Sequence, residues 1–203
     1  MASKSNKINS NGWVPQRRVR LYIIALKNQG NDVVEMCWPS PREADRVQMK
    51  DIFDKDAQTL NTYTNYPLPP PSTKGSTRKR DHIAEVLKKV QALAQKKCNP
   101  VEIPVIVDTG SSNLNWAVGE SPTITKSRGQ ARDFWSLQHG RPLTVVEMLR
   151  LQGFPVEDMD LSMLSHRQIG LAAGSSHMLP IAQALLKAAM KAVESAGQSE
   201  GCG

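Results

Sequence analysis

The sequence predicts a mixed α/β fold, because strand-like and helix-like apolar patterns both occur along its 203 residues. Residues 21–26 (LYIIAL) are apolar on both faces, which is typical of a strand covered on both sides. Residues 83–94 carry apolar side chains at helical spacing, and residues 179–194 are apolar except for one narrow polar stripe. A chain of this length can bury a core in one large domain or two small ones.

The amino-terminal third is expected to contain a polar tail and two strands. Residues 1–12 (MASKSNKINSNG) are polar throughout, and we expect them to be disordered. The apolar strand at 21–26 follows, and a second short strand is expected over residues 32–38, stopped by Pro39 and Pro41. Residues 56–80 are rich in Pro, Ser, Thr and Gly and end in a basic cluster, so we expect a loop or linker there.

The middle of the chain is expected to contain one amphipathic helix and one strand. Asp81 is a suitable N-cap for a helix that ends before Pro100. Its apolar stripe consists of Ile83, Val86, Leu87, Val90, Leu93 and Ala94. Residues 103–113 (IPVIVDTGSSN) then predict a short strand that runs into a polar turn.

The last third contains a short helix with signals at both ends. Thr144 and Glu147 form a capping-box pattern, and Gly153 with Pro155 is a stop signal. The final helix, over residues 179–194, is so apolar that most of it must be buried. Because this helix and the strand at 21–26 both need covering layers, we expect part of the domain to lie outside this chain.

Positive charge is concentrated in two blocks of a chain whose net charge is +7. Residues 1–30 hold six Lys or Arg and no acid, and residues 57–100 hold eight against two acids. Two such blocks in an otherwise balanced chain indicate a localised surface that faces a polyanion. The alternative is an ordinary solvated surface with a flexible tail.

Cysteine usage and hydropathy indicate an intracellular, membrane-free protein. Cys37, Cys98 and Cys202 are odd in number and lack metal-ligand spacing, which argues for a reducing compartment and against a zinc site or a disulfide framework. No apolar run has the length of a membrane-spanning helix, and the first residues lack the core of a signal peptide. We expect location in the nucleus if the source is eukaryotic, and otherwise in the cytoplasm.

Three segments resemble, in the correct order, the carboxy-terminal motifs of the DNA cytosine-5 methyltransferase family. Residues 15–20 (PQRRVR) match its Pro-Gln-x-Arg-x-Arg motif, which precedes an apolar strand. Residues 141–155 (RPLTVVEMLRLQGFP) resemble its Arg-x-Leu-Thr-x-x-Glu-x-x-x-Leu-Gln-Gly-Phe-Pro motif. Residues 166–170 (HRQIG), followed by a buried helix, are similar to its final Gln-Ile-Gly-Asn-Ala segment. The resemblance implies the carboxy-terminal portion of a Rossmann-like methyltransferase with an inserted small α+β target-recognition domain.

The resemblance implies a chemistry for the first motif. Enzymes of this family flip the target cytosine out of the duplex, attack it with a cysteine and transfer a methyl group from S-adenosyl-L-methionine to carbon 5. Their two motif arginines contact the flipped cytosine and its flanking phosphate, and here these are Arg18 and Arg20, with Gln16 helping to place the loop. Guanidinium groups suit this role because they match phosphate oxygens bidentately. The alternative is a pair of surface arginines that flank a strand.

The resemblance also implies how the chain is divided into regions. It implies a strand of the catalytic core at 13–26, a target-recognition region at 27–140 that includes the basic loop at 56–80, core helices at 141–194 and a flexible tail at 195–203. Two groups are candidate DNA contacts: Lys74, Arg78, Lys79 and Arg80 of the basic loop, and Thr125, Lys126 and Arg128 of the hydroxyl-rich run SPTITKSRG. For the basic loop, a solvated loop or a nuclear-import signal is the alternative.

The third motif implies a cofactor contact. In the family this segment closes the methionine end of the S-adenosyl-L-methionine pocket, which here assigns Gly170, Leu171 and Ala172. The sequence departs from the family at Leu171, which stands where the family has asparagine and cannot make its polar contacts.

Several family motifs are not found in these residues, namely the glycine-rich cofactor turn, the Pro-Cys nucleophile loop and the Glu-Asn-Val segment. We therefore expect a carboxy-terminal fragment or one subunit of a split enzyme, inactive alone, whose partners are DNA and the missing amino-terminal half or a catalytic subunit. The alternatives are a non-catalytic DNA-binding relative and an RNA cytosine-5 methyltransferase relative. No motif reveals the target sequence.

Overall fold

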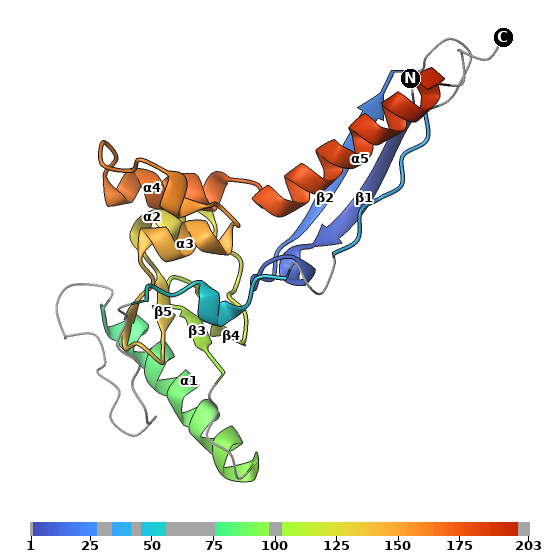
Figure 1. Ribbon diagram of the computed structural model, residues 1–203. Helices are drawn as coiled ribbons and strands as arrows, with labels where there is room; N and C mark the ends of the chain where they lie inside the picture. The colour runs from blue at the N-terminus through green and yellow to red at the C-terminus, as the bar shows by residue number, and fades with distance from the viewer. Residues whose placement is uncertain (1, 28–33, 42–45, 56–75, 98–102, 199–203) are drawn as a thin grey trace.

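The computed structural model describes residues 2–27, 34–41, 46–55, 76–97 and 103–198. The chain is mixed α/β, as predicted, and has a body and a long arm (Figure 1). The arm consists of β1 (Ala2–Asn9), β2 (Val19–Leu26) and α5 (Leu179–Gln198).

Strand β1 overturns the expectation of a disordered amino-terminal tail. It pairs antiparallel with β2 along its whole length, from Ala2 opposite Leu26 to Asn9 opposite Val19, and a short 3-10 turn at Ser10–Gly12 follows. Its side chains are almost all polar, so no apolar pattern marked it. The backbone ladder supplies the order, because pairing N–H and C=O groups needs no apolar side chain.

Helix α5 covers one face of β2. Tyr22, Ile24 and Leu26 pack towards this helix, whereas Leu21 and Ile23 on the other face are 57% and 68% exposed. The prediction of a strand covered on both sides therefore holds for only one side within this chain. The prediction of a nearly fully buried final helix is likewise met on one side, and its opposite side exposes Leu186 and Met190.

The strand expected over residues 32–38 does not form in its described part, residues 34–38. Val34 and Met36 alternate with exposed neighbours, as they would in a strand, but they pack against α5 near Ala192 instead of joining a ladder. Residues 32–33 lie outside the described residues.

The body is built on a four-stranded antiparallel sheet of order β4-β3-β5-β6. Its strands are β3 (Val105–Asp108), β4 (Asn115–Val118), β5 (Phe134–Ser136) and β6 (Arg141–Pro142). Side chains of β3 alternate between two cores, as period-2 geometry requires. Val105 and Val107 pack with the long helix α1 (Ser76–Lys97), and Ile106 packs with the short helix α3 (Val145–Leu151).

Helix α1 begins earlier than the sequence indicated. Its apolar stripe is confirmed by the full burial of Ile83, Val86 and Val90. Its first turns, however, take residues 76–80 out of the loop that was expected over 56–80. Residues 56–75 lie outside the described residues.

Helix α3 confirms the predicted end signals. The Thr144 hydroxyl accepts from the Glu147 N–H, and the Glu147 carboxylate accepts from the Thr144 N–H at 2.8 Å. The helix ends at Leu151, and Gly153 has the positive φ of 79° that suits a helix end. Of the described helices, none alone is long and apolar enough to cross a membrane, although α5 with the preceding helix at 166–175, bent by 44°, meets that test by length and composition.

Candidate nucleic-acid interface

Two loops far apart in sequence are joined at the junction of arm and body. We call residues 15–18 the arginine loop and residues 120–125 the threonine loop. Gln16 and Ser121 form a parallel β-bridge, with the Arg17 N–H donating to the Ser121 carbonyl at 3.0 Å and the Ser121 N–H to the Pro15 carbonyl at 2.7 Å. The two segments that the sequence singled out separately therefore lie side by side in the fold.

Side chains strengthen this junction. The Thr123 hydroxyl donates to the Arg17 carbonyl at 2.5 Å. Both Nε and Nη2 of Arg17 donate to Oε1 of Glu120, at 2.9 and 2.6 Å. Two backbone and three side-chain hydrogen bonds thus fix the path of the chain just before Arg18.

Arg18 lies mostly inside this junction. Only 7% of it is exposed, and its Nη1 donates to the Ile124 carbonyl at 3.1 Å. Burial, and then the nearby charge of Arg20, lowers the pKa of the Arg18 guanidinium. That bond uses one of the five N–H donors of the guanidinium group.

Arg20 and Gln16 occupy the two ends of the motif. Arg20 is exposed at the start of β2 and donates to the Val19 carbonyl at 2.9 Å. Gln16 is fully buried, and its carbonyl accepts from the Ser10 hydroxyl at 2.6 Å. The structure thus places Arg18 and Arg20 close together and turns Gln16 into the interior.

The three candidates after the threonine loop have different surroundings. Thr125 is the N-cap of helix α2 (Lys126–Ala131), with no side-chain capping bond, and Lys126 is exposed beside it. Arg128 points inward and donates to the carboxylate of Asp108 at 2.6 Å. Burial raises the pKa of the Asp108 carboxyl even though Arg128 favours its charged form. Lys126 is therefore freer to meet an anion than Arg128.

The candidates of the basic loop lie on another element. Arg78 is exposed and Arg80 is half-buried on the first turns of α1, while Lys79 pairs with Asp133 at 2.5 Å. Lys74 lies outside the described residues. The DNA-contact role of this group stays a prediction.

The residues assigned to the cofactor lie on helix α4 (His166–Ser175). Gly170 is buried against α2, where a Cβ would overlap the Gly129 carbonyl oxygen. Leu171 is half-buried and Ala172 exposed, and neither side chain has a polar atom. These residues alone do not make a cradle that fits S-adenosyl-L-methionine, so their cofactor role stays a prediction.

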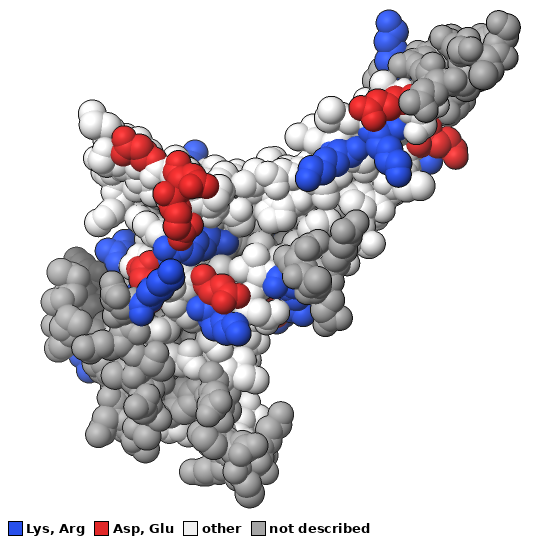
Figure 2. All heavy atoms as spheres, viewed as in Figure 1, with Lys and Arg blue, Asp and Glu red and all other residues white. Residues whose placement is uncertain are grey.

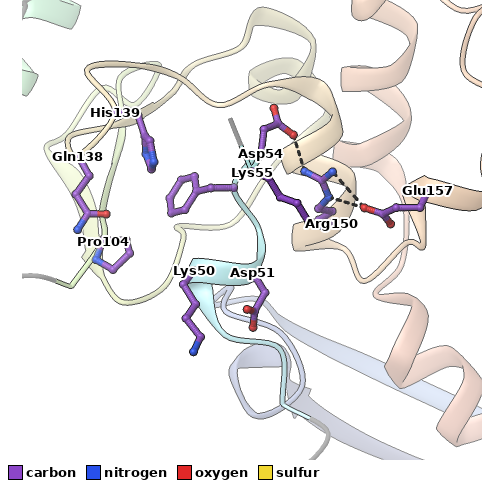
Figure 3. A pocket seen from close by; sticks show the side chains of 10 residues that line it. Lys50, Asp51, Asp54, Lys55, Pro104, Gln138, His139, Arg150 and Glu157 are labelled. Atoms are coloured by element: carbon purple, nitrogen blue, oxygen red, sulfur yellow. Dashed lines mark hydrogen bonds and ion pairs between the residues drawn. The ribbon is translucent and has the colours of Figure 1, made fainter. Parts of the chain in front are cut away.

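A cleft of about 560 Å³ lies beside α3 (Figure 3). In the wall of this cleft, Arg150 joins two carboxylates, donating to Asp54 at 2.6 Å and to Glu157 at 3.2 Å. The rings of Phe53 and His139 meet at 4.1 Å between centroids, and burial lowers the pKa of His139. This cleft was not predictable from the sequence, because its walls come from distant segments.

Charge is mixed on the face shown in Figure 2, where Lys and Arg side chains lie next to Asp and Glu side chains over the body and along α5. The described residues contain no group of three or more His, Cys, Asp or Glu side chains placed to bind a metal ion. Glu120 was not identified from the sequence, and neither was the contact of Ser121, the first residue of the run SPTITKSRG, with the arginine loop. Both residues hold that loop from more than a hundred positions away, and no local pattern indicated this.

The fold and the site define a mixed α/β protein in which an arginine motif is held against a hydroxyl-rich loop. The model of the C-5 cytosine-specific DNA methylase family matches residues 9–191, and the chain belongs to this family. No curated protein and no solved structure matches the chain.

Proposed function

We propose that this chain takes part in methyl transfer to carbon 5 of a cytosine flipped out of DNA. The observation that carries the proposal is the junction of the arginine and threonine loops, which holds Arg18 and Arg20 next to each other. In this role the two guanidinium groups contact the flipped base and its phosphate, and Lys126 and the hydroxyl of Thr125 lie along the DNA backbone. Members of the family generally take the methyl group from S-adenosyl-L-methionine.

The nucleophile is expected to come from polypeptide outside these 203 residues, either a preceding segment or a partner subunit. The exposed apolar faces of β2 and α5 support this, since Leu21, Ile23, Leu186 and Met190 are each more than half exposed. The polypeptide that carries the nucleophile would cover these faces and complete the Rossmann-like sheet at the same time. Mapping the 5′ end of the transcript and reading the frame upstream of Met1 would show which polypeptide carries the Pro-Cys loop. We expect the complete enzyme inside the cell, in the nucleus of a eukaryote.

A duplex-binding measurement tests the role of the arginines. We expect Arg18→Gln or Arg20→Gln to weaken binding of a short fluorescein-labelled duplex and to reduce the salt slope by about 1, because each change removes about one phosphate contact. Lys187→Gln, on the solvent stripe of α5, is the matched control and should leave both quantities unchanged. Unchanged salt slopes in folded Arg18→Gln and Arg20→Gln proteins would contradict the proposal.

A non-catalytic DNA-binding role is the second candidate, and Leu171 in place of the family's asparagine favours it. This role predicts duplex binding that S-adenosyl-L-methionine does not change. The enzyme role predicts cofactor-dependent covalent trapping on DNA once the polypeptide with the nucleophile is present.

A further inference from the structure

The side chains of Gln16 and Gln152 meet in the interior, where the arginine loop, α3 and α5 come together. Both residues are fully buried, and Nε2 of Gln152 lies 3.4 Å from Oε1 of Gln16. The backbone of Gln152 also serves two helices: its N–H donates to the Leu149 carbonyl and its carbonyl accepts from the Leu179 N–H, both at 2.9 Å. One residue therefore contacts the end of α3, the start of α5 and the arginine loop.

The surroundings of this amide pair are tightly packed. Gly153 has a positive φ, and a Cβ there would overlap the ring of Pro180 and lie 3.6 Å from Val14. Among the described residues, Nε2 of Gln16 and Oε1 of Gln152 have no hydrogen-bond partner. Because a buried amide without a partner is costly, and because two facing amides can exchange two hydrogen bonds, each of these side chains depends on the other.

We propose that Gln152 is a positioning residue whose side chain holds Gln16, and through it the arginine loop, in the arrangement that presents Arg18. Gln16 lies two residues before Arg18 and is the point at which the arginine loop bridges Ser121. A shift of its side chain would therefore move the whole junction with the threonine loop. This inference rests on the proposed function, since that function gives Arg18 its contact with DNA.

A single and a double variant distinguish a positioning role of Gln152 from a purely stabilising one. Gln152→Leu leaves the Gln16 amide buried without a partner and should lower the free energy of unfolding. The double variant Gln16→Leu, Gln152→Leu removes both amides and should regain most of that stability, because apolar groups of similar size can replace a buried pair. If Gln152 positions the arginine loop, however, the double variant still lacks the hydrogen bond between the two amides that holds this loop in place. Gln183→Leu, on the exposed stripe of α5, is the matched control.

Hydrogen exchange of the 203-residue chain measures the stability of the arginine loop directly. In both the single and the double variant we expect the Arg17 amide, which donates to Ser121, to exchange about fivefold to tenfold faster, as the loss of one hydrogen bond implies, while amides within β3 are unchanged. The control should match the parent chain. An unchanged Arg17 amide in the stable double variant would overturn the proposal.

Duplex binding supplies the second readout. We expect the double variant to lose the same share of the salt slope as Arg18→Gln, with no further loss when the changes are combined. If the double variant keeps the parent salt slope while Arg18→Gln loses it, the positioning role is refuted. If Arg18→Gln itself has no effect, the proposed function fails, whereas the exchange result still decides whether Gln152 holds the loop.

Discussion

Glu147 is a buried carboxylate whose hydrogen bonds join several segments of the fold. Its carboxylate has no exposed surface and accepts two hydrogen bonds from the Arg141 guanidinium, at 2.7 and 2.9 Å. It also accepts from the backbone N–H groups of Thr144 and Asp54. One residue thus caps α3, pairs with β6 and ties residues 46–55 to the body.

The surroundings of Glu147 predict a pH dependence of stability. Burial raises the pKa of its carboxyl, but hydrogen bonds from Arg141 and from the two backbone N–H groups outweigh burial, so the net pKa is below the ordinary value of 4.5. A carboxyl with a lowered pKa in the fold stabilises it fully above the unfolded pKa, and this stabilisation is lost as the pH falls through the folded pKa. Part of the acid sensitivity of the chain therefore belongs to this residue.

We expect Glu147→Gln to lower the free energy of unfolding at neutral pH by about 2 kcal/mol. This is less than the loss of about 3–5 kcal/mol for fully buried pairs, because Arg141 is partly exposed. The variant should also lose less stability than the parent as the pH falls from about 5 to about 3, since the carboxyl of Glu147 becomes protonated in this range and an amide does not titrate. Urea unfolding at a series of pH values measures both effects. Glu194→Gln on exposed α5 should follow the parent, and parallel curves for all three proteins would contradict the assignment.

At this scale the sequence predicted contacts within a few residues and missed the distant ones. The Thr144–Glu147 capping box was readable because it lies within one helical turn. The backbone N–H of Asp54 donates to the same carboxylate from 93 positions away, and only the fold brings the two residues together. Arg18 was identified through its motif. Its hydrogen bond to the Ile124 carbonyl could not be predicted, because nothing near Arg18 in the sequence indicates this neighbour.

The contact between α2 and α4 depends on glycines. Gly129 of α2 and Gly170 of α4 approach so closely that a Cβ on either would overlap the other's carbonyl oxygen. Gly174, one turn along α4, faces the Thr125 carbonyl in the same way. Since Thr125 ends the threonine loop, this glycine contact places the loop relative to α4.

Gly170→Ala tests this helix crossing. In an exposed helix interior such a change would stabilise by up to about 1 kcal/mol. Here the added methyl group meets backbone, which cannot move aside as a side chain can, so we expect a net loss of about 3 kcal/mol, at the upper end for overpacking. Thermal or urea unfolding measures the change. Ser175→Ala, exposed on the same helix, should be nearly neutral, and a Gly170→Ala protein as stable as the parent would show that the helices are not in contact at this point.

Elements with an apolar period were predictable, and elements without one were not. The spacing of Ile83, Val86 and Val90 located α1, yet its start was missed because the turns before Asp81 are basic and polar. Strand β1 was missed for the same reason. Residues 34–38 had the right alternation for a strand, but packing against α5 decided their structure instead.

The whole molecule has distinct cores in the arm and in the body, and the partly buried Val47 packs against one core of each. The body cores include Phe134, Ile106 and Val105, whereas the arm cores consist mainly of Val14, Ile181 and their neighbours on β2 and α5. In Figure 1 the arm projects away from the body, with the start of β1 and the end of α5 at its tip. The sequence predicted uncovered apolar faces, but not that they would lie on a projecting arm.

This division predicts that the arm opens more easily than the body. A sheet of two strands is marginal on its own, and β1–β2 is supported by only one helix and exposes one apolar face to water. Strand β3, by contrast, is paired on both sides and covered by a core on each face. The arm should therefore unfold locally at a lower free energy than the body.

Native-state hydrogen exchange measures this difference. We expect amides of β1 and β2 to exchange at least about tenfold faster than those of β3, and this gap to persist at low denaturant, where local opening dominates. A polypeptide that covers the face of Leu21 and Ile23 should slow exchange in the arm and leave β3 unchanged, because binding stabilises only the part it contacts. Leu21→Ser with Ile23→Ser should abolish that slowing while leaving β3 as it was. Equal protection of arm and body in the chain alone would mean that the two cores unfold as one unit, so that the exposed face of β2 causes no local weakness.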